Sequence, residues 1–377
     1  MSVFSNLARR AFILMNIGAA LLFLLACANW LLDPSQWWFI ALLGLAFPFL
    51  VAALVVFFIG WLLVRSKWAF LSLVTLLIGY TNLHALVGIN FGKTFQMSRQ
   101  PATLRVMSWN VHQFGFYQGR QGGLETRRKM LDFVHQQNPD VICMQEFVTD
   151  RPIGNNHVNV FKLFADLGYK YSFFAGDYIQ SNGKYTMGVA ILSKLPITDS
   201  FHLRYEGDVA SMSAESLLAA DINFDGRPVR IFTTHLQSNR LEKEEYSQVT
   251  ARRAVEDSAY FASKSIVRKL RTAYGFRSQQ TQKVAAALNA SPHPSILAGD
   301  FNDVPNSYTY YQLRKGRQDA FVEKGWGLGR TFSHISPTLR IDYIMVDKRF
   351  EVVQYKCTPL GLSDHYPIVT DLKLKAD

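Results

Sequence analysis

Polar residues that can bind a metal ion or move a proton stand where apolar runs of this chain end. Asn110 follows the run 104–107 and Glu146 follows the run 140–144. Because an α/β sheet gathers its strand ends at one edge, we expect these side chains to share a pocket. The further candidates are His235 in Thr-His-Leu, Asp300 and Asn302 in Gly-Asp-Phe-Asn, Asp342 in Arg-Ile-Asp-Tyr-Ile, and Asp364 and His365 in Ser-Asp-His-Tyr-Pro.

These residue types suit the hydrolysis of a phosphate ester. The anionic oxygens of such an ester repel a nucleophile and its alkoxide leaves poorly, so a divalent cation that screens charge assists both steps. Mg²⁺ prefers oxygen ligands and keeps several waters, so one or two carboxylates suffice, and Glu146 is the first candidate. His365 is the natural cation to face the transition state, and Asp342 can hold its other ring nitrogen.

The six motifs, in this order, resemble the endonuclease/exonuclease/phosphatase superfamily, which includes exonuclease III-like nucleases, pancreatic-type deoxyribonucleases, neutral sphingomyelinases and inositol polyphosphate phosphatases. The resemblance covers residues 103–374 and implies a hydrolase that uses Mg²⁺ or Mn²⁺. It implies that Asn110, Glu146 and Asp364 form the metal site, that Asp300 orients or deprotonates the attacking water, that Asn302 binds this water or the phosphate, that His365 pairs with Asp342, and that His235 donates to a non-bridging phosphate oxygen.

Two details of the motifs bear on the substrate. Exonuclease III-like enzymes for abasic sites lack a histidine at the place of His235, whereas deoxyribonuclease- and sphingomyelinase-like members have it. The inositol phosphatase branch typically has a tryptophan before Gly-Asp and an arginine soon after the asparagine, where this chain has Ala298 and the run 303–305. The complete catalytic set argues against a non-enzymatic membrane scaffold.

The first 90 residues are predicted to form a membrane anchor. The chain is 49% hydrophobic, and almost all of the excess lies before residue 91. The three apolar stretches at 11–32, 37–64 and 68–89 carry no charge. Each reaches the roughly 20 residues that a helix needs to cross a bilayer, so we expect three transmembrane helices.

The first and the third of these stretches are less certain as transmembrane helices than the second. The first stretch, with Cys27 near its end, also fits a cleavable signal peptide or a lipoprotein attachment site. A retained helix is favoured because another apolar segment follows almost at once. The third stretch contains Asn82 and His84, and polar groups at membrane depth are costly unless they face protein or the interface. The third span therefore has the weakest support.

The flanking charges predict the topology, because lysine and arginine mark the cytoplasmic side. Arg9, Arg10, Arg65 and Lys67 place the N-terminus inside, and three crossings then place the following domain outside. In a bacterium this is the periplasmic face of the inner membrane. The basic residues after the third stretch favour a cytoplasmic domain instead, but long domains translocate largely regardless of charge. These residues are Lys93, Arg99 and Arg105.

Beyond a polar linker at 91–103, strands and helices alternate through a catalytic domain at 104–377. The fold class is α/β, a four-layer sandwich of two packed mixed sheets flanked by helices. We expect strands at 104–111, 141–144, 171–174, 187–193, 216–223, 229–234, 295–298, 341–346, 351–357 and 368–373, and helices at 123–137, 158–166, 241–270, 278–290 and 307–313. The three cysteines fit no disulfide framework.

The segment between His235 and Asp300 is longer than the core of the predicted sandwich requires. Residues 261–283 carry six basic residues and no acidic one, with apolar residues interleaved. One interpretation is a long surface helix that packs its apolar side on the domain. The other is a basic amphipathic element that lies on anionic lipid or beside the substrate cleft.

Together these features predict a membrane-anchored phosphodiesterase. A short tether restricts the domain to what reaches the membrane surface, which favours a phospholipid-like substrate. The net charge of +11 suits an anionic phosphoester, although membrane flanks account for nearly half of it. A tethered nuclease acting on DNA or RNA is the close alternative, followed by a phosphomonoesterase. The expected partners are the lipid bilayer and the anionic substrate, and the sequence does not indicate an obligate protein partner.

Overall fold

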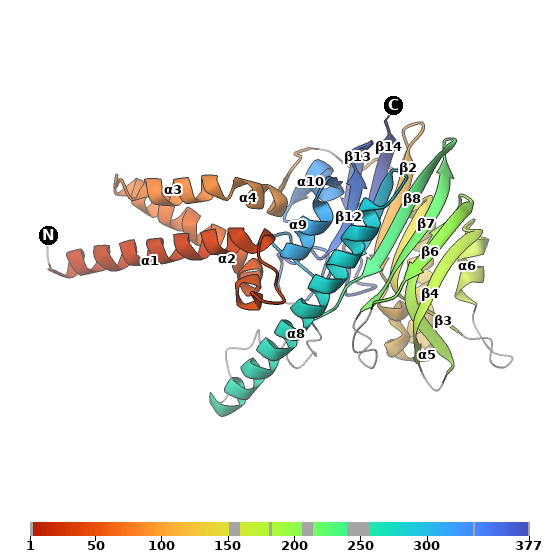
Figure 1. Ribbon diagram of the computed structural model, residues 1–377, viewed down its shortest axis with the longest axis horizontal. Coiled ribbons are helices and arrows are strands. Elements are labelled where there is room, and N and C mark those ends of the chain that lie inside the picture. Colours follow the sequence, from red (N-terminus) through yellow and green to blue (C-terminus); the bar gives the residue numbers. More distant parts are fainter. Residues whose placement is uncertain are drawn as a thin grey trace.

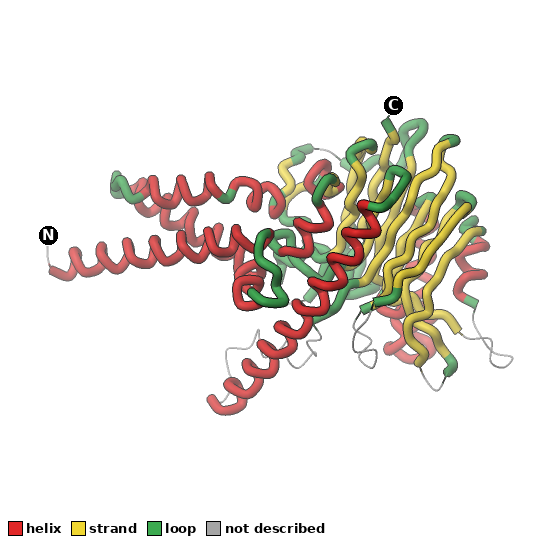
Figure 2. The backbone as a smooth tube through the Cα atoms, viewed as in Figure 1, coloured by secondary structure: helices red, strands yellow, loops and turns green. Residues whose placement is uncertain are grey.

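The computed structural model describes residues 3–92, 94–150, 159–180, 183–205, 214–239, 256–334 and 336–375. Helices at the N-terminus extend from one side of an α/β sandwich that comprises the rest of the chain (Figures 1 and 2). The fold class predicted from the sequence is confirmed, because two mixed sheets pack face to face between helices.

Each of the two large sheets has six strands. The first sheet contains, in spatial order, β13 (Phe350–Cys357), β14 (Ile368–Leu374), β2 (Leu104–Asn110), β3 (Val141–Asp150), β5 (Tyr185–Ser193) and β4 (Tyr171–Gln180). The second contains β10 (Arg317–Asp319), β12 (Asp342–Asp347), β9 (Ser295–Asp300), β8 (Arg227–His235), β7 (Glu215–Phe224) and β6 (Ile197–Leu203). Strand β6 was not predicted, because it is an edge strand with mostly exposed, polar residues.

The strand register brings the ends of distant strands together. Strands β2 and β3 are parallel and pair Asn110 with Gln145, the neighbour of Glu146. Strands β8 and β9 are also parallel and pair His235 with Asp300, and antiparallel β12 pairs Asp342 with the same Asp300. Three predicted site residues of the second sheet therefore lie side by side.

Apolar side chains fill the space between the sheets and under the helices on both outer faces. Val106 and Ile191 of the first sheet share a buried cluster with Ile296 of the second. Helices α5 (Gly119–Gln137) and α6 (Val160–Asp166) cover the first sheet, and α8 (Glu256–Asn289) and α9 (Tyr308–Arg314) cover the second. The smaller elements are the 3₁₀ helix η2 (His112–Gln118), α10 (Ala320–Lys324), and the two-residue strands β1 (Gly88–Ile89) and β11 (Trp326–Gly327), which pair.

The N-terminal helices, α1 to α4, pack on one another beside the sandwich (Figure 1). They are α1 (Val3–Cys27), followed by the 3₁₀ helix η1 (Ala28–Trp30), α2 (Trp38–Leu63), α3 (Ala69–Ile78) and α4 (Tyr80–Leu86). Two helical stretches, Asn6–Trp30 and Trp38–Leu63, are long and apolar enough to cross a membrane. A third span exists if α3 and α4 are counted together, but these two helices are bent by 70° at Gly79.

Helix α4, which follows the bend, is hydrogen-bonded to the sandwich. Asn82 is 3% exposed and points at the sandwich, where its Nδ2 donates to Oδ1 of Asn306 at 2.7 Å. In the structure, the predicted third helix is therefore two helices, α3 and α4. Asn82, whose polarity gave the third span the weakest support, forms a hydrogen bond with the sandwich.

Asn306 is the meeting point of the N-terminal helices and the sandwich. Its Nδ2 donates to the carbonyl of Ala26 at 3.0 Å, and its own carbonyl accepts from Nδ2 of Asn29 at 3.2 Å. A Cβ on Gly44 of α2 would lie 2.6 Å from the same carbonyl oxygen, so α2 needs glycine to approach this closely. With Asn82, four helical segments of the N-terminal part, α1, η1, α2 and α4, contact one buried residue.

A buried cation makes a second attachment. Arg340 donates from Nη1 to Asp319 and from Nη2 to the carbonyl of Ala85 in α4, both at 2.6 Å. Its guanidinium also lies over the ring of Phe321, 4.4 Å from the centroid. Because a charge buried in this way needs a partner and hydrogen bonds, the end of α4 has a defined position on the sandwich.

The segment predicted as a linker lies against the sandwich. Gln96 exchanges hydrogen bonds with the side chain of Gln354 on β13, and Arg99 forms an ion pair with Asp140 at 2.7 Å. The N-terminal helices are therefore in direct contact with the domain rather than joined to it by a free tether.

The basic segment is a single helix, where two helices were predicted at 241–270 and 278–290. Helix α8 is continuous from Glu256 to Asn289, and residues 240–255 lie outside the described residues. Arg277, in the predicted gap, is 1% exposed and donates to the carbonyl of Gln237 at 2.8 and 3.0 Å. These contacts attach the residues of the predicted gap to the segment that follows β8.

We predict that Asn306→Ala destabilises the full-length protein by about 1–3 kcal/mol, because buried donors and acceptors lose their partner. Thermal unfolding in detergent, followed by tryptophan fluorescence, measures the loss. Asn223→Ala, at an exposed position of β7, is the control and should leave the unfolding temperature unchanged. Equal unfolding temperatures for the wild type and Asn306→Ala would contradict the role given to this residue.

Candidate active site

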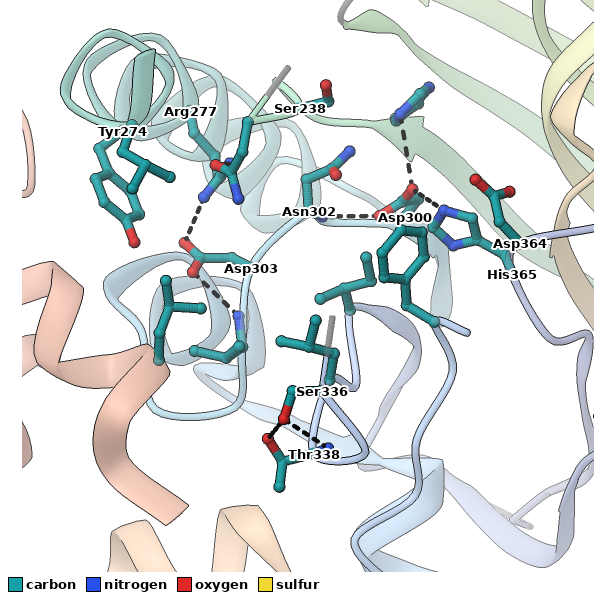
Figure 3. Close-up of a pocket in the computed structure, with 18 of the residues that line it drawn as sticks. Ser238, Tyr274, Arg277, Asp300, Asn302, Asp303, Ser336, Thr338, Asp364 and His365 are labelled. Atoms are coloured by element: carbon teal, nitrogen blue, oxygen red, sulfur yellow. Dashed lines mark hydrogen bonds and ion pairs between the residues drawn. The ribbon is translucent and has the colours of Figure 1, made fainter. Parts of the chain in front are cut away.

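A cavity of about 580 Å³ contains most of the predicted site residues (Figure 3). Asn110 and Asp342 are buried behind its wall and bonded to residues that line it. The eight predicted residues are thus brought together, although the roles given to them remain predictions. The six that line the cavity are Glu146, His235, Asn302, Asp300, Asp364 and His365.

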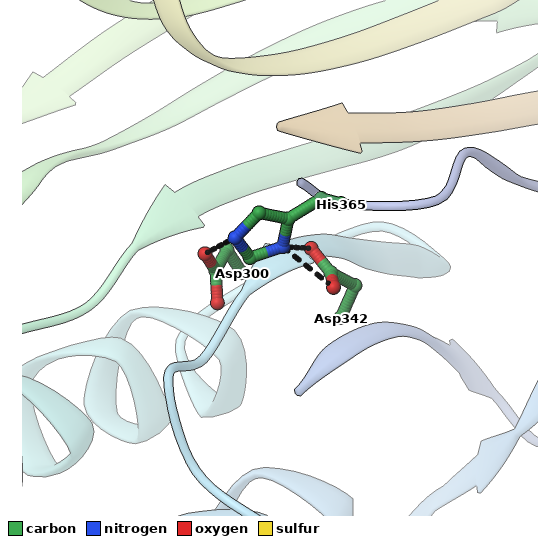
Figure 4. A group of neighbouring side chains, drawn as sticks. All are labelled: Asp300, Asp342 and His365. Carbon is green, nitrogen blue, oxygen red and sulfur yellow. Dashed lines mark hydrogen bonds and ion pairs between the residues drawn. The ribbon is translucent and has the colours of Figure 1, made fainter. Parts of the chain in front are cut away.

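His365 lies between two carboxylates (Figure 4). Its Nδ1 is 2.9 Å from Asp342, and its Nε2 is 3.6 Å from Asp300. Burial alone would lower the pKa of His365, but the nearby charges of Asp342 and Asp300 outweigh burial and raise this pKa well above its ordinary value. The two carboxylates therefore favour the protonated ring, with one nitrogen fixed by Asp342 and the other directed toward Asp300.

A second histidine and carboxylate pair lies on the other side of Asp300. Nε2 of His235 is 3.6 Å from Asp300, and its Nδ1 is 3.2 Å from Glu215. Burial alone would lower the pKa of His235, but Glu215 and then Asp300 raise it to about 9. Asp300 thus lies between two imidazolium groups.

Sequence reasoning missed Glu215. This residue is 1% exposed, and besides facing His235 it accepts a hydrogen bond from the backbone N–H of Glu146 at 2.9 Å. The available signal was an acidic residue at the start of the apolar run 217–220. A buried carboxylate costs free energy unless it is paired, and both partners of Glu215 belong to the site.

Glu146 points into the cavity because strand β3 has a bulge. The pairing of β3 with β5 shifts register between Met144 and Phe147, and Glu146 has a φ of 51°. A bulge of this kind redirects one side chain out of the normal alternation. Oε1 of Glu146 accepts from Nδ2 of Asn110 at 3.1 Å, and the same Nδ2 lies 3.1 Å from Asp300.

Two loops complete the site. The backbone N–H of Asn302 donates to Asp300 at 2.8 Å, and the side-chain Nδ2 of Asn302 donates to the carbonyl of Leu236 at 2.9 Å. In the loop before β14, Ser363 donates to the carbonyl of Asn110 at 2.8 Å. This bond holds the next residue, Asp364, near the end of β2. Burial acts to raise the pKa of Asp364, but the charges of His365, His112 and His334 and the hydrogen bond from Ser363 together outweigh it, so the pKa is lowered.

Two groups of residues have the donor atoms for a metal ion. Glu146, Asp364 and Asn110 offer carboxylate and amide oxygens, the ligands that Mg²⁺ and Mn²⁺ prefer. In this structure Nδ2 of Asn110 faces Glu146, so the amide would have to turn over to present its oxygen. Asp300, Asp342 and His365 have ligand atoms within 4.8 Å of one another, but a protonated His365 already lies between these two carboxylates. The first group therefore fits the ion better.

The far end of the cavity is apolar. Leu45 and Phe49 of α2 line it, together with Ile266 and Leu270 of α8. Figure 3 shows the reddish ribbon of the N-terminal helices at the end of the cavity that lies away from Asp364 and His365. The apolar side of α8 thus packs on the domain, as the first interpretation of the basic segment expected, and part of it also lines the cavity. The contribution of α2 was not predicted.

The comparison with known families agrees with this geometry. Residues 107–365 match the Endonuclease/Exonuclease/phosphatase family. The chain belongs to this family. Residues 9–86 match a separate domain of unknown function. Among curated proteins, no match to the chain is found.

Solved structures of the family share the fold of the sandwich. A family member from Leptotrichia buccalis is 18% identical, with a TM-score of 0.52, covering 72% of this chain and 100% of its own. One from Beutenbergia cavernae is 20% identical, with a TM-score of 0.51, covering 73% and 72%. The catalytic domain of human Nocturnin, with a bound sulfate anion, is 18% identical, with a TM-score of 0.50, covering 76% and 96%. As a member of this family, the chain has the fold of a phosphoesterase or nuclease.

We predict that Glu215→Gln lowers kcat about 10–100-fold, as expected for a residue that positions others. The substitution preserves size but removes the charge that raises the pKa of His235. Hydrolysis of bis(4-nitrophenyl) phosphate by the full-length protein measures kcat and KM separately. The control is Glu351→Gln, at an exposed position of β13. If Glu215→Gln has the same kcat as the control, the pair of His235 and Glu215 has a structural role and does not contribute to catalysis.

Proposed function

We propose that this protein is a membrane-embedded, divalent-metal-dependent phosphodiesterase that acts on a phospholipid-like substrate. One observation carries the choice of substrate: the cavity that contains Asp300 and His365 is also lined by Leu45 and Phe49 of α2. Helix α2 is one of the two that are long and apolar enough to cross a membrane. A substrate with a phosphodiester and an apolar chain matches both ends of this cavity.

In the proposed reaction, Asp300 accepts a proton from a water whose oxygen adds to phosphorus. The bond from phosphorus to one ester oxygen breaks, this oxygen takes up a proton as an alcohol, and a phosphate monoester remains. His365 and His235, both protonated, donate to the non-bridging oxygens as negative charge develops there. Asp342 and Glu215 keep the two rings oriented.

Glu146, Asp364 and Asn110 would hold Mg²⁺ or Mn²⁺. When bound, such an ion screens the phosphate charge and stabilises the leaving oxygen. The carboxylates suit this task because the pKa of Asp364 is lowered, which keeps it ionised. Asn302 is placed beside Asp300 to bind the water or the phosphate.

The topology that we propose places the sandwich on the outer face of the membrane, which in a bacterium is the periplasmic face of the inner membrane. In Figure 1 the N-terminus and the connection from α2 to α3 lie at the end of the helices that is far from the sandwich. This connection contains Arg65 and Lys67, and Arg9 and Arg10 are near the N-terminus. By the positive-inside rule, this far end is cytoplasmic.

The test uses the purified full-length protein in lipid nanodiscs, because α1, η1, α2 and α4 all contact the loop that follows Asp300. Phospholipids, plasmid DNA, RNA and bis(4-nitrophenyl) phosphate are each offered with Mg²⁺, with Mn²⁺ or with EDTA. We expect cleavage of phospholipid and of the small diester with either ion, and none with EDTA.

In the same assay, Asp300→Asn should lower kcat about 10²–10⁴-fold and His365→Ala about 10²–10³-fold. The control is His135→Ala, at an exposed position of α5, which should retain full activity. Cleavage of DNA or RNA without cleavage of lipid would make the protein a tethered nuclease and contradict the proposed substrate.

A further inference from the structure

Two cavities lie on either side of Asp364. The first is the 580 Å³ cavity described above, here called the α2 cavity. The second, of about 930 Å³, is here called the His334 cavity and is lined by residues that include His112, Gln118, Ser333 and His334. Asp364 lines both. We infer that a membrane lipid binds across this junction, with its acyl chains in the α2 cavity and its polar headgroup in the His334 cavity.

The apolar wall of the α2 cavity is continuous with the surface of α2. Leu45 and Phe49 are four residues apart, so they lie on one face of the helix, one turn from each other. Phe49 is 60% exposed. At 1.5 Å per residue they lie about 10 and 16 Å along α2 from Trp38, the end near the sandwich. This distance is comparable to the half-thickness of a bilayer's hydrocarbon core, about 15 Å.

A lipid that moves along α2 reaches the catalytic carboxylates along apolar walls, past the ion pair of Arg277 and Asp303. Ile266 and Leu270 of α8 and Leu339 add further apolar surface to this cavity. The occupant of this end is an acyl chain, because α2 is apolar along its length and has the reach of a membrane span. A nucleic acid would place its charged backbone or its polar bases against the same wall.

The His334 cavity offers different chemistry. The imidazoles of His112 and His334, the amide of Gln118 and the hydroxyl of Ser333 can donate and accept hydrogen bonds. Groups of this kind suit the hydroxyl, amine or phosphate groups of a headgroup and do not suit a hydrocarbon chain.

The loop from Phe332 to His334 separates the two cavities. Phe332 lines the α2 cavity, whereas Ser333 lines the His334 cavity and donates its backbone N–H to the carbonyl of Asp364 at 2.8 Å. A phosphodiester at Asp364 thus has one ester arm on each side of this loop. This inference rests on the proposed function, since it takes Asp364 as part of the site that binds the phosphate and its metal.

The test for the acyl-chain site compares phospholipids with long and short chains, and the small soluble diester, in the full-length protein. Leu45→Trp fills the α2 cavity and Phe49→Ala, at an exposed position, removes an apolar wall. Each should raise KM for the long-chain lipid at least about tenfold and leave kcat/KM for the small diester nearly unchanged. Val56→Trp is the control, because Val56 is on α2, 64% exposed and not among the residues that line the cavity.

His334→Ala tests the headgroup site. We expect it to change the ratio of kcat/KM between phospholipids with different headgroups and to leave the dependence on chain length unchanged. The inference is overturned if the α2 variants slow the lipid and the small diester equally, or if Val56→Trp acts as they do. It is also overturned if His334→Ala leaves the headgroup ratio unchanged.

A failure of the proposed function can be told apart from a failure of this inference. If the wild type cleaves the small diester but no lipid, a non-hydrolysable phosphonate analogue of a long-chain phospholipid is used as an inhibitor of diester cleavage. Inhibition that Phe49→Ala weakens and Val56→Trp does not would support the binding site although the proposed substrate is wrong. Absence of inhibition of the wild type would overturn the site itself.

Discussion

The structure depends on how the buried side chain of Asn306 joins the N-terminal helices to the loop that follows Asp300. Its side-chain amide group bonds to Ala26 and Asn82, and the backbone carbonyl of the same residue bonds to Asn29. These three partners belong to different helical segments. Buried polar groups are costly without partners, so this arrangement fixes where the helices meet the sandwich. The same loop contains Asn302, so the position of the helices and the geometry of the catalytic centre are set together.

Charge organises the catalytic centre itself. Asp300 lies 3.6 Å from one nitrogen of both His235 and His365, and each ring has a second carboxylate, Glu215 or Asp342, at its other nitrogen. Because burial weakens hydration of all these groups, each charge depends on its partners. The result is a pair of fixed cations on either side of one carboxylate, with further carboxylate and amide oxygens from Glu146, Asp364 and Asn110 nearby.

Short motifs allowed the convergence of the candidate site residues to be predicted, because residues such as Asp300 and Asn302 follow a buried strand and strand ends converge in an α/β sandwich. Contacts between distant segments escaped prediction. Glu215 has no motif, and its role depends on the pairing of β7 with β8. Arg277 of α8 bonds to Gln237, 40 residues away. Asn82, in the helix after the bend, bonds to Asn306, 224 residues away, and no periodicity reveals such a contact.

The central claim is that a membrane helix and the catalytic residues form one binding site for a lipid. A phospholipid with a photoreactive diazirine in its acyl chain, crosslinked to the full-length protein in nanodiscs and mapped by mass spectrometry, tests this claim directly. The account predicts labels at residues 45–49 and 266–270, reduced by an excess of unlabelled lipid and retained in Asp300→Asn. Labels spread evenly over the lipid-facing surface of α2, including Val56, and insensitive to competitor would contradict it.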